Sequence, residues 1–246
     1  EMPLDQLAQA ANVDLLPPVT DHARPPVDED ALAQAAALLA GAKAPMIFIG
    51  GGAVESGEAV QALAEMLQAP VIANRTGRGI LSDRHYLSMT QLAGHRLWAS
   101  ADVVLAVGTR LQPPRMNWGT DDDLKIIHLD IDPVEIKRTA TPDVAIVGDA
   151  QDIMPALVDA VGKLAPGRAS REDELAAVQG GVHEMLLDRL GPQMAWIKVL
   201  REALDDDGIF VDELTQVGYV SRVAMPVYRP RSFLTSAYQG TLGCGL

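Results

Sequence analysis

The chain has 246 residues, which fits about one and a half to two domains, and its hydrophobic fraction of 48% with only 4% aromatic residues favours α/β architecture. Acidic residues outnumber basic ones by 33 to 20 and no dense Lys/Arg stripe occurs, which argues against a nucleic-acid partner. No apolar run reaches membrane-spanning length, and the single cysteine, Cys244, forms no internal disulfide and fits a reducing cytoplasm.

Prolines predict an extended linker near the start of the chain. The segments Leu15-Leu-Pro-Pro18 and Arg24-Pro-Pro26 oppose both helix formation and strand pairing. We expect residues 1–27 to be a linker from an earlier domain, because the first residues are typical of the exit from a strand. Asp28-Glu-Asp30 then provides a cap and first-turn acids for an Ala/Leu helix that runs to about Ala42.

Apolar runs separated by helical stretches predict a parallel sheet. Met46–Ile49 is a buried strand, and it is followed by Gly50-Gly-Gly52, a helix over about 55–67 and the short strand Val71–Ala73. Strands that are apolar throughout need cover on both faces, so we expect a doubly wound, Rossmann-like sheet over residues 28–164. The further strands and the closing helix are predicted at 102–107, 125–130, 144–147 and 149–164.

Ligands of such a sheet bind beyond the carboxyl ends of its strands. The residues expected there are glycines that allow close approach, an arginine for phosphate and acids for ribose. The candidate nucleotide-binding residues are Gly51, Gly52, Gly108, Thr109, Arg110, Asp130, Ile131 and Asp149. The same residue types are ordinary in turns and helix caps, so the residues alone leave both interpretations open.

A second unit is predicted from residue 192 to residue 246. Residues 165–191 are expected to be an interdomain linker with a polar helical stretch that ends at Gly191-Pro192. A helix over 193–204 and a strand over 209–211 follow. Glycines at 240, 243 and 245 come after a strand-like segment, and such a turn suits an anion, although a tight structural turn is the alternative.

Several segments resemble, in order and spacing, the thiamine diphosphate (ThDP) enzymes of the acetolactate synthase-like group. The resemblance implies a central domain and, at 192–246, the start of a second α/β domain that binds the cofactor diphosphate. It implies a carboligase or decarboxylase that acts on 2-oxo acids, uses ThDP and Mg²⁺, and forms a cytoplasmic homodimer or homotetramer. The matching segments are residues 44–52, 101–110, 126–133, 147–149, 210–218 and 238–246.

The resemblance also implies roles for residues of the C-terminal segments. Gly240 and Leu242 are implied to be catalytic, because the Gly240 carbonyl accepts a hydrogen bond from the cofactor and Leu242 is the apolar wedge that holds the cofactor bent. The Mg²⁺ ligands and an activating glutamate are implied to lie outside this chain, so we expect the chain alone to be inactive. The implied cofactor-binding residues are Glu213, Leu214, Thr215, Gln216, Thr241 and Gly243.

Flavin on the central domain is a separate question. Some members of the group bind FAD there, but Ser88–Ala101 is shorter than the FAD-binding counterpart and Leu111-Gln-Pro-Pro114 replaces an acidic stretch. The resemblance therefore favours a domain without FAD over one with FAD, and it leaves open whether ADP binds there. A second functional hypothesis is a stand-alone module that binds FAD, ADP or NAD without catalysis, against which the segments at 215–216 and 240–242 argue.

Overall fold

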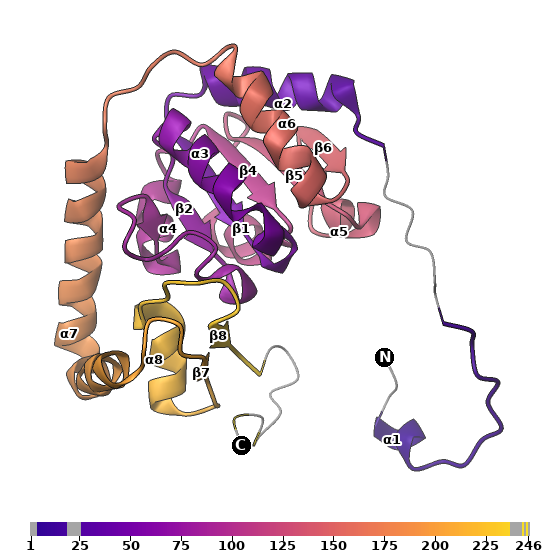
Figure 1. Ribbon diagram of the computed structural model, residues 1–246, viewed down its shortest axis with the longest axis vertical. Helices are drawn as coiled ribbons and strands as arrows, with labels where there is room; N and C mark the ends of the chain where they lie inside the picture. Colours follow the sequence, from indigo (N-terminus) through magenta and orange to yellow (C-terminus); the bar gives the residue numbers. More distant parts are fainter. Residues whose placement is uncertain (1–3, 19–25, 237–242, 244, 246) are drawn as a thin grey trace.

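The computed structural model describes residues 4–18, 26–236, 243 and 245. A six-stranded parallel sheet lies at its centre, in the order β3-β2-β1-β4-β5-β6 (Figure 1). β1 and β4 are adjacent, with Ile47 opposite Leu105, and this confirms the predicted doubly wound sheet. The strands are β1 (Pro45–Ile49), β2 (Val71–Ala73), β3 (Ser88–Met89), β4 (Val103–Val107), β5 (Lys125–Asp130) and β6 (Val144–Val147).

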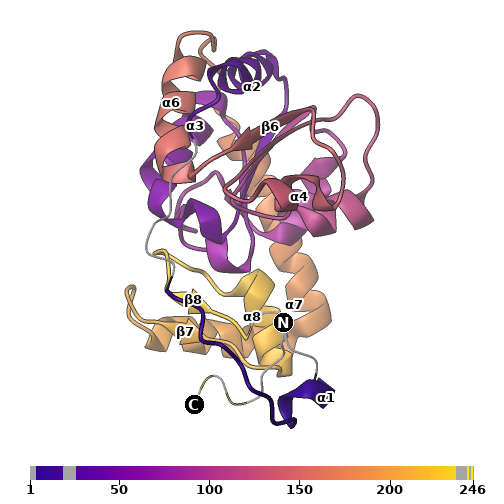
Figure 2. The ribbon, with the colours of Figure 1, turned by 90° about the vertical axis from the view of Figure 1, so that its right-hand side faces the viewer.

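Helices cover both faces of this sheet. α2 (Glu29–Gly41), α3 (Gly57–Leu67) and α6 (Ala150–Gly162) pack together on one face, and α4 (Gln91–Trp98) lies on the other (Figures 1 and 2). Side-chain oxygens of Asp28 and Asp149 cap α2 and α6, as the sequence predicts for Asp28. The remaining short elements are η1 (Gly51–Ser56), η2 (Arg75–Gly77), η3 (Pro114–Trp118) and α5 (Pro133–Arg138).

Aromatic rings complete the core beneath α4. The Phe48 ring of β1 lies with its centroid 5.7 Å from that of Trp98 and 5.8 Å from that of Trp118. The Trp98 indole also donates to the Gly119 carbonyl at 2.6 Å, so its polar atom is satisfied. These contacts fix the loop between β4 and β5, which forms one wall of the cleft described below.

A long helix, α7 (Glu172–Ala203), leads away from the sheet. Its main chain leaves helical geometry only at Leu190 (φ −134°, ψ 32°), and beyond that residue the helix changes direction (Figures 1 and 2). The break coincides with the predicted boundary at Gly191-Pro192, and proline is tolerated there because it falls in the first turn of the second segment. The buried side chains of Leu175 and Val182 pack this helix onto the rest of the core.

A small C-terminal unit, made of β7 (Phe210–Val211), α8 (Gln216–Ala224) and β8 (Phe233–Leu234), lies at the carboxyl edge of the sheet (Figure 1). β7 and β8 pair in parallel. At the other end of the chain, α1 (Leu4–Leu7) is followed by residues 8–18, which are exposed and contain no helix or strand.

Candidate functional site

A cleft of about 320 Å³ opens at the carboxyl ends of β1, β2 and β4. It lies at the point where the order of the sheet reverses, since the chain leaves β1 toward β2 on one side and β4 continues toward β5 on the other. This is where doubly wound sheets bind their ligands. The lining residues are Gly50, Gly51, Asn74, Arg75, Thr76, Gln91, Gly108, Thr109, Arg110, Gln112, Pro113 and Thr235.

Glycines let the two strand ends approach each other closely. A Cβ atom on Gly50 would lie 2.3 Å from the Gly108 carbonyl oxygen, and one on Gly52 would lie 2.7 Å from the Gly108 Cα. Gly108 itself has φ +56°, a conformation that disfavours other residues. The floor of the cleft is therefore bare main chain, as the strand-end glycines predict.

A chain of polar contacts forms the side wall. The Gln91 amide donates to the Asn74 side-chain oxygen, and the Asn74 amide donates to the Thr109 hydroxyl at 2.5 Å. Thr109 is only 6% exposed, so this network fixes the Asn74 side chain beside the glycines. Sequence reasoning did not single out Gln91, which follows the capping residue Thr90 at the start of α4.

A histidine lies directly beneath this wall. His128 of β5 is 1% exposed, and its Nε2 lies 2.8 Å from the Thr109 carbonyl oxygen. A carbonyl oxygen only accepts, so this ring nitrogen donates. Burial is the main cause that lowers the pKa of His128, against the opposing effect of the nearby Asp130 charge. The sequence places His128 among scattered histidines, and only the fold brings it under the cleft.

We expect protonation of His128 to destabilise the protein. Because its folded pKa is below the ordinary value of 6.5, the unfolded chain takes up the proton first as the pH falls. The contribution to the free energy of unfolding is therefore present above pH 6.5 and is lost as the pH falls below it. Its size is about 1.4 kcal/mol for each unit by which the folded pKa lies below the unfolded pKa. Urea unfolding of wild type and His128→Gln at a series of pH values checks this. Identical pH slopes for the two proteins would contradict it.

The remaining candidate nucleotide residues lie around the cleft with partners of their own. Arg110 pairs with Glu135 of α5 at 3.0 Å. Asp130 accepts from the Asp132 main-chain N–H at 3.0 Å, and Asp149 accepts from that of Gln151 at 2.9 Å, so both acids act in turns or caps. The candidates Gly52, Asp130, Ile131 and Asp149 are not among the residues that line the cleft, and Ile131 is 58% exposed.

Four of the predicted cofactor-binding residues, at 213–216, lie at the start of α8. The Thr215 hydroxyl caps this helix by accepting from the Gly218 N–H at 3.0 Å. The Glu213 carboxylate accepts from the Gly245 N–H at 2.6 Å, so Gly245 lies near the start of the helix. Gly243 has φ +82°, as a turn glycine requires. The candidates Gly240, Thr241 and Leu242 lie outside the described residues.

The side chains next to them have different partners. The Gln216 side-chain oxygen accepts from the Gln193 amide of α7 at 2.8 Å, while Thr215 and Gln216 both remain exposed.

Among the described residues, no three His, Cys, Asp or Glu side chains gather as a metal site. In the same part of the chain, no helix is long and apolar enough to cross a membrane.

Comparison with known proteins agrees with this geometry. Residues 32–157 match the family model for the thiamine pyrophosphate enzyme central domain, pyrophosphate being the older name for diphosphate. The chain is 33% identical over 234 residues to the probable 2-ketoarginine decarboxylase AruI of Pseudomonas aeruginosa, covering 88% of this chain and 40% of that protein.

Two further relatives are matched along the whole chain. The acetolactate synthase isozyme 1 large subunit of Escherichia coli K12 is 29% identical over 258 residues (45% of that protein), and the sulfoacetaldehyde acetyltransferase of Roseovarius nubinhibens is 30% identical over 283 residues (46% of that protein). The chain thus spans less than half the length of the curated relatives named here. Because the family model covers the sheet that carries the cleft, the chain belongs to the thiamine diphosphate-dependent enzymes and contains their central domain.

Proposed function

We propose that the protein to which this chain belongs is a ThDP-dependent carboligase or decarboxylase that acts on 2-oxo acids. The match of residues 32–157 to the family model carries this proposal. The matched relatives include a decarboxylase, an acetolactate synthase and an acetyltransferase, and their alignments continue past the central sheet into the C-terminal unit. None of these comparisons favours a stand-alone nucleotide-binding module. By the same resemblance we propose a homodimer or homotetramer.

The start of α8 suits the cofactor diphosphate. Exposed N–H groups at a helix start attract anions, and the Thr215 hydroxyl and Gln216 amide are neutral hydrogen-bonding groups. The Glu213 carboxylate does not suit a phosphate, and we propose that it instead holds Gly245 through the contact with its N–H. When bound with Mg²⁺, ThDP supplies a heterocycle that accepts electrons as the bond to the carboxyl group breaks.

The remaining residues are proposed to position this cofactor. We propose that Leu214, Thr241 and Gly243 contact it, that the Gly240 carbonyl accepts a hydrogen bond from it, and that Leu242 supports its bent conformation. These roles rest on the resemblance of the surrounding segments and on the closeness of Glu213 to Gly245.

The cleft at the strand ends is proposed to hold no flavin in the purified protein. Its volume of about 320 Å³ is at the lower end for small-molecule sites, Pro113 and Gln112 form part of its lining, and Asp130 and Asp149 already serve turns and caps. If a nucleotide binds, Gly51, Gly108, Thr109 and Arg110 are the residues that would meet it.

The test is an assay of the complete protein with ThDP and Mg²⁺. We expect CO₂ release from at least one member of a panel that contains pyruvate, 2-ketoarginine and aromatic 2-oxo acids, and no release when ThDP is omitted. Turnover of sulfoacetaldehyde is assayed in parallel, because one matched relative is a sulfoacetaldehyde acetyltransferase. A protein that binds ThDP but turns over none of these compounds would contradict the proposed reaction class. An absorption spectrum of the same preparation, with a stoichiometric flavin band, would contradict the proposal for the cleft.

A further inference from the structure

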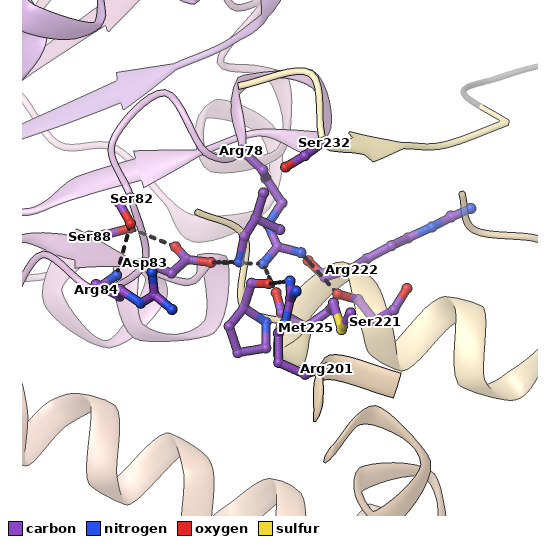
Figure 3. A network of polar contacts seen from close by, with 12 residues as sticks. Arg78, Ser82, Asp83, Arg84, Ser88, Arg201, Ser221, Arg222, Met225 and Ser232 are labelled. Carbon is purple, nitrogen blue, oxygen red and sulfur yellow. Dashed lines mark hydrogen bonds and ion pairs between the residues drawn. The ribbon is translucent and has the colours of Figure 1, made fainter. Parts of the chain in front are cut away.

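A buried arginine joins the central sheet to the C-terminal unit. Arg78, which follows η2, is 9% exposed, and its guanidinium reaches the carboxyl end of α8 (Figure 3). One guanidinium nitrogen donates to the carbonyl oxygens of Ser221 at 2.9 Å and Arg222 at 3.3 Å. The other donates to the Met225 carbonyl. These carbonyls belong to the last turn of α8 and to the residue after it, and the Ser221 carbonyl also accepts from the Met225 N–H at 3.0 Å. A positive charge there opposes the negative end of the helix dipole.

Asp83 makes this arrangement specific. Its carboxylate lies 3.2 Å from the Arg78 guanidinium and accepts from the Val227 N–H at 2.8 Å, while the Asp83 N–H donates to the Val227 carbonyl at 3.0 Å (Figure 3). The other carboxylate oxygen accepts from the Ser88 hydroxyl at 2.7 Å. Asp83 therefore neutralises Arg78 and also anchors the chain just after α8. We call Arg78, Asp83 and their main-chain partners at 221–227 the Arg78 network.

Burial of this charge has a cost that a purely structural contact would avoid. Desolvation lowers the pKa of Arg78, against the opposing effect of Asp83. Apolar side chains of similar volume often stabilise such a boundary as well as a buried ion pair does. The Arg78 guanidinium, by contrast, contacts several fixed carbonyls at once and so determines where the end of α8 lies.

The position of the carboxyl end of α8 also determines where its amino end lies, because the two ends belong to one helix. It is a rigid helix of 9 residues, with the Arg78 network at its carboxyl end and Thr215 at its start. We infer that Arg78 is a positioning residue for cofactor binding, because it holds α8 so that Thr215 and Gln216 meet the cofactor diphosphate. The inference rests on the proposed function, and it assigns to a central-domain residue the alignment of a site in the C-terminal unit.

The experiment uses the complete protein and three variants of the network. Arg78→Met removes the charge and the donors, Arg78→Lys keeps the charge, and Asp83→Asn removes the counter-charge with little change of shape. The matched control is Arg84→Met. Arg84 also joins the sheet domain to the C-terminal side through Asp206, at 2.7 and 2.9 Å, but it is 59% exposed and makes no described contact with α8.

Two measurements report on positioning separately from activity. Hydrogen exchange of the apoprotein over residues 216–224 should be faster in Arg78→Met and unchanged in Arg84→Met. At a temperature where all variants are folded, the dissociation constant of ThDP in Arg78→Met should rise about tenfold, the effect of one lost charge-assisted hydrogen bond. The kcat at saturating ThDP should fall by up to about 100-fold with little change in KM for the 2-oxo acid, and Arg78→Lys should restore part of both.

The outcomes separate the two proposals. If the wild type binds ThDP, and Arg78→Met binds it equally well with unchanged exchange in α8, the inference is wrong while the proposed function stands. If ThDP affinity falls equally in Arg84→Met, the effect is general loosening and the inference is also wrong. If the wild type binds no ThDP, the proposed function fails and the positioning role fails with it. Where Arg78→Met does not fold, Arg78→Lys and Asp83→Asn provide the same comparison.

Discussion

Gly79→Ala is expected to destabilise the protein by about 3 kcal/mol or more. Gly79 has φ +82°, and a Cβ atom there would lie 2.0 Å from the Arg229 carbonyl oxygen of the C-terminal unit. A backbone oxygen cannot move aside as a flexible side chain can, so the two parts of the molecule must separate. Chemical unfolding of the variant measures the loss, and faster hydrogen exchange at residues 226–234 should accompany it.

Gly119→Ala is the matched control. Gly119 has φ +83°, almost the same as Gly79, but a Cβ atom there would meet nothing within 4 Å. Both variants place alanine at positive φ, which costs about 1–3 kcal/mol for a residue other than glycine. We expect a larger loss in Gly79→Ala than in Gly119→Ala because only Gly79→Ala has the contact with Arg229. Equal losses in both would show that the chain relaxes around residue 79 at no cost.

Asp212→Ala is expected to cost about 3–5 kcal/mol, because it leaves a charge without its partner in a largely buried position. Asp212 is 1% exposed, and its carboxylate lies 2.5 Å from the Arg222 guanidinium of α8. The Asp212 N–H also donates to the Leu234 carbonyl at 2.9 Å, so the side chain lies where β7, β8 and α8 meet. Urea unfolding gives the free energy of unfolding of wild type and variant.

An exposed ion pair is the control for this prediction. Lys198 and Glu202 lie 3.9 Å apart on α7 and are 77% and 65% exposed, so Glu202→Ala should change the free energy of unfolding by no more than about 0.5 kcal/mol. The double variant Asp212→Leu with Arg222→Met should regain most of the loss, because an apolar pair replaces the buried charges. A small loss in Asp212→Ala, similar to that of Glu202→Ala, would show that the buried pair contributes nothing.

The central strands could be predicted from the sequence because their own residues determine them. β1 and β4 are apolar throughout, and β5 is apolar at Ile126, Ile127 and Leu129, which is typical of strands buried on both faces. β3 could not be predicted in this way. It has only the two residues Ser88 and Met89, and it exists because β2 offers an open edge for pairing. The position of the break in α7 could be predicted from Gly191-Pro192, but the direction that the helix takes after the break depends on packing.

The candidate site also has residues that could be predicted from the sequence and residues that could not. The glycines of the cleft were predictable, since glycine after a strand is a local signal of close approach. His128 and Arg78 gave no such signal. One is a single histidine inside an apolar strand, and the other acquires its partners from residues 143 positions or more away in the chain, at Ser221 and Met225. Contacts of this kind appear only when the tertiary structure is known.

The long sequence separation within the Arg78 network has a consequence for the order of folding. The central sheet and its helices are complete by Gly162, whereas the carbonyl partners of Arg78 begin at Ser221, so the sheet can form on the ribosome while the Arg78 guanidinium is still in water beside Asp83. Its hydration is then given up only in the last step, when the C-terminal unit docks. A newly made sheet domain thus carries the Arg78–Asp83 ion pair in water at the edge where the C-terminal unit later docks.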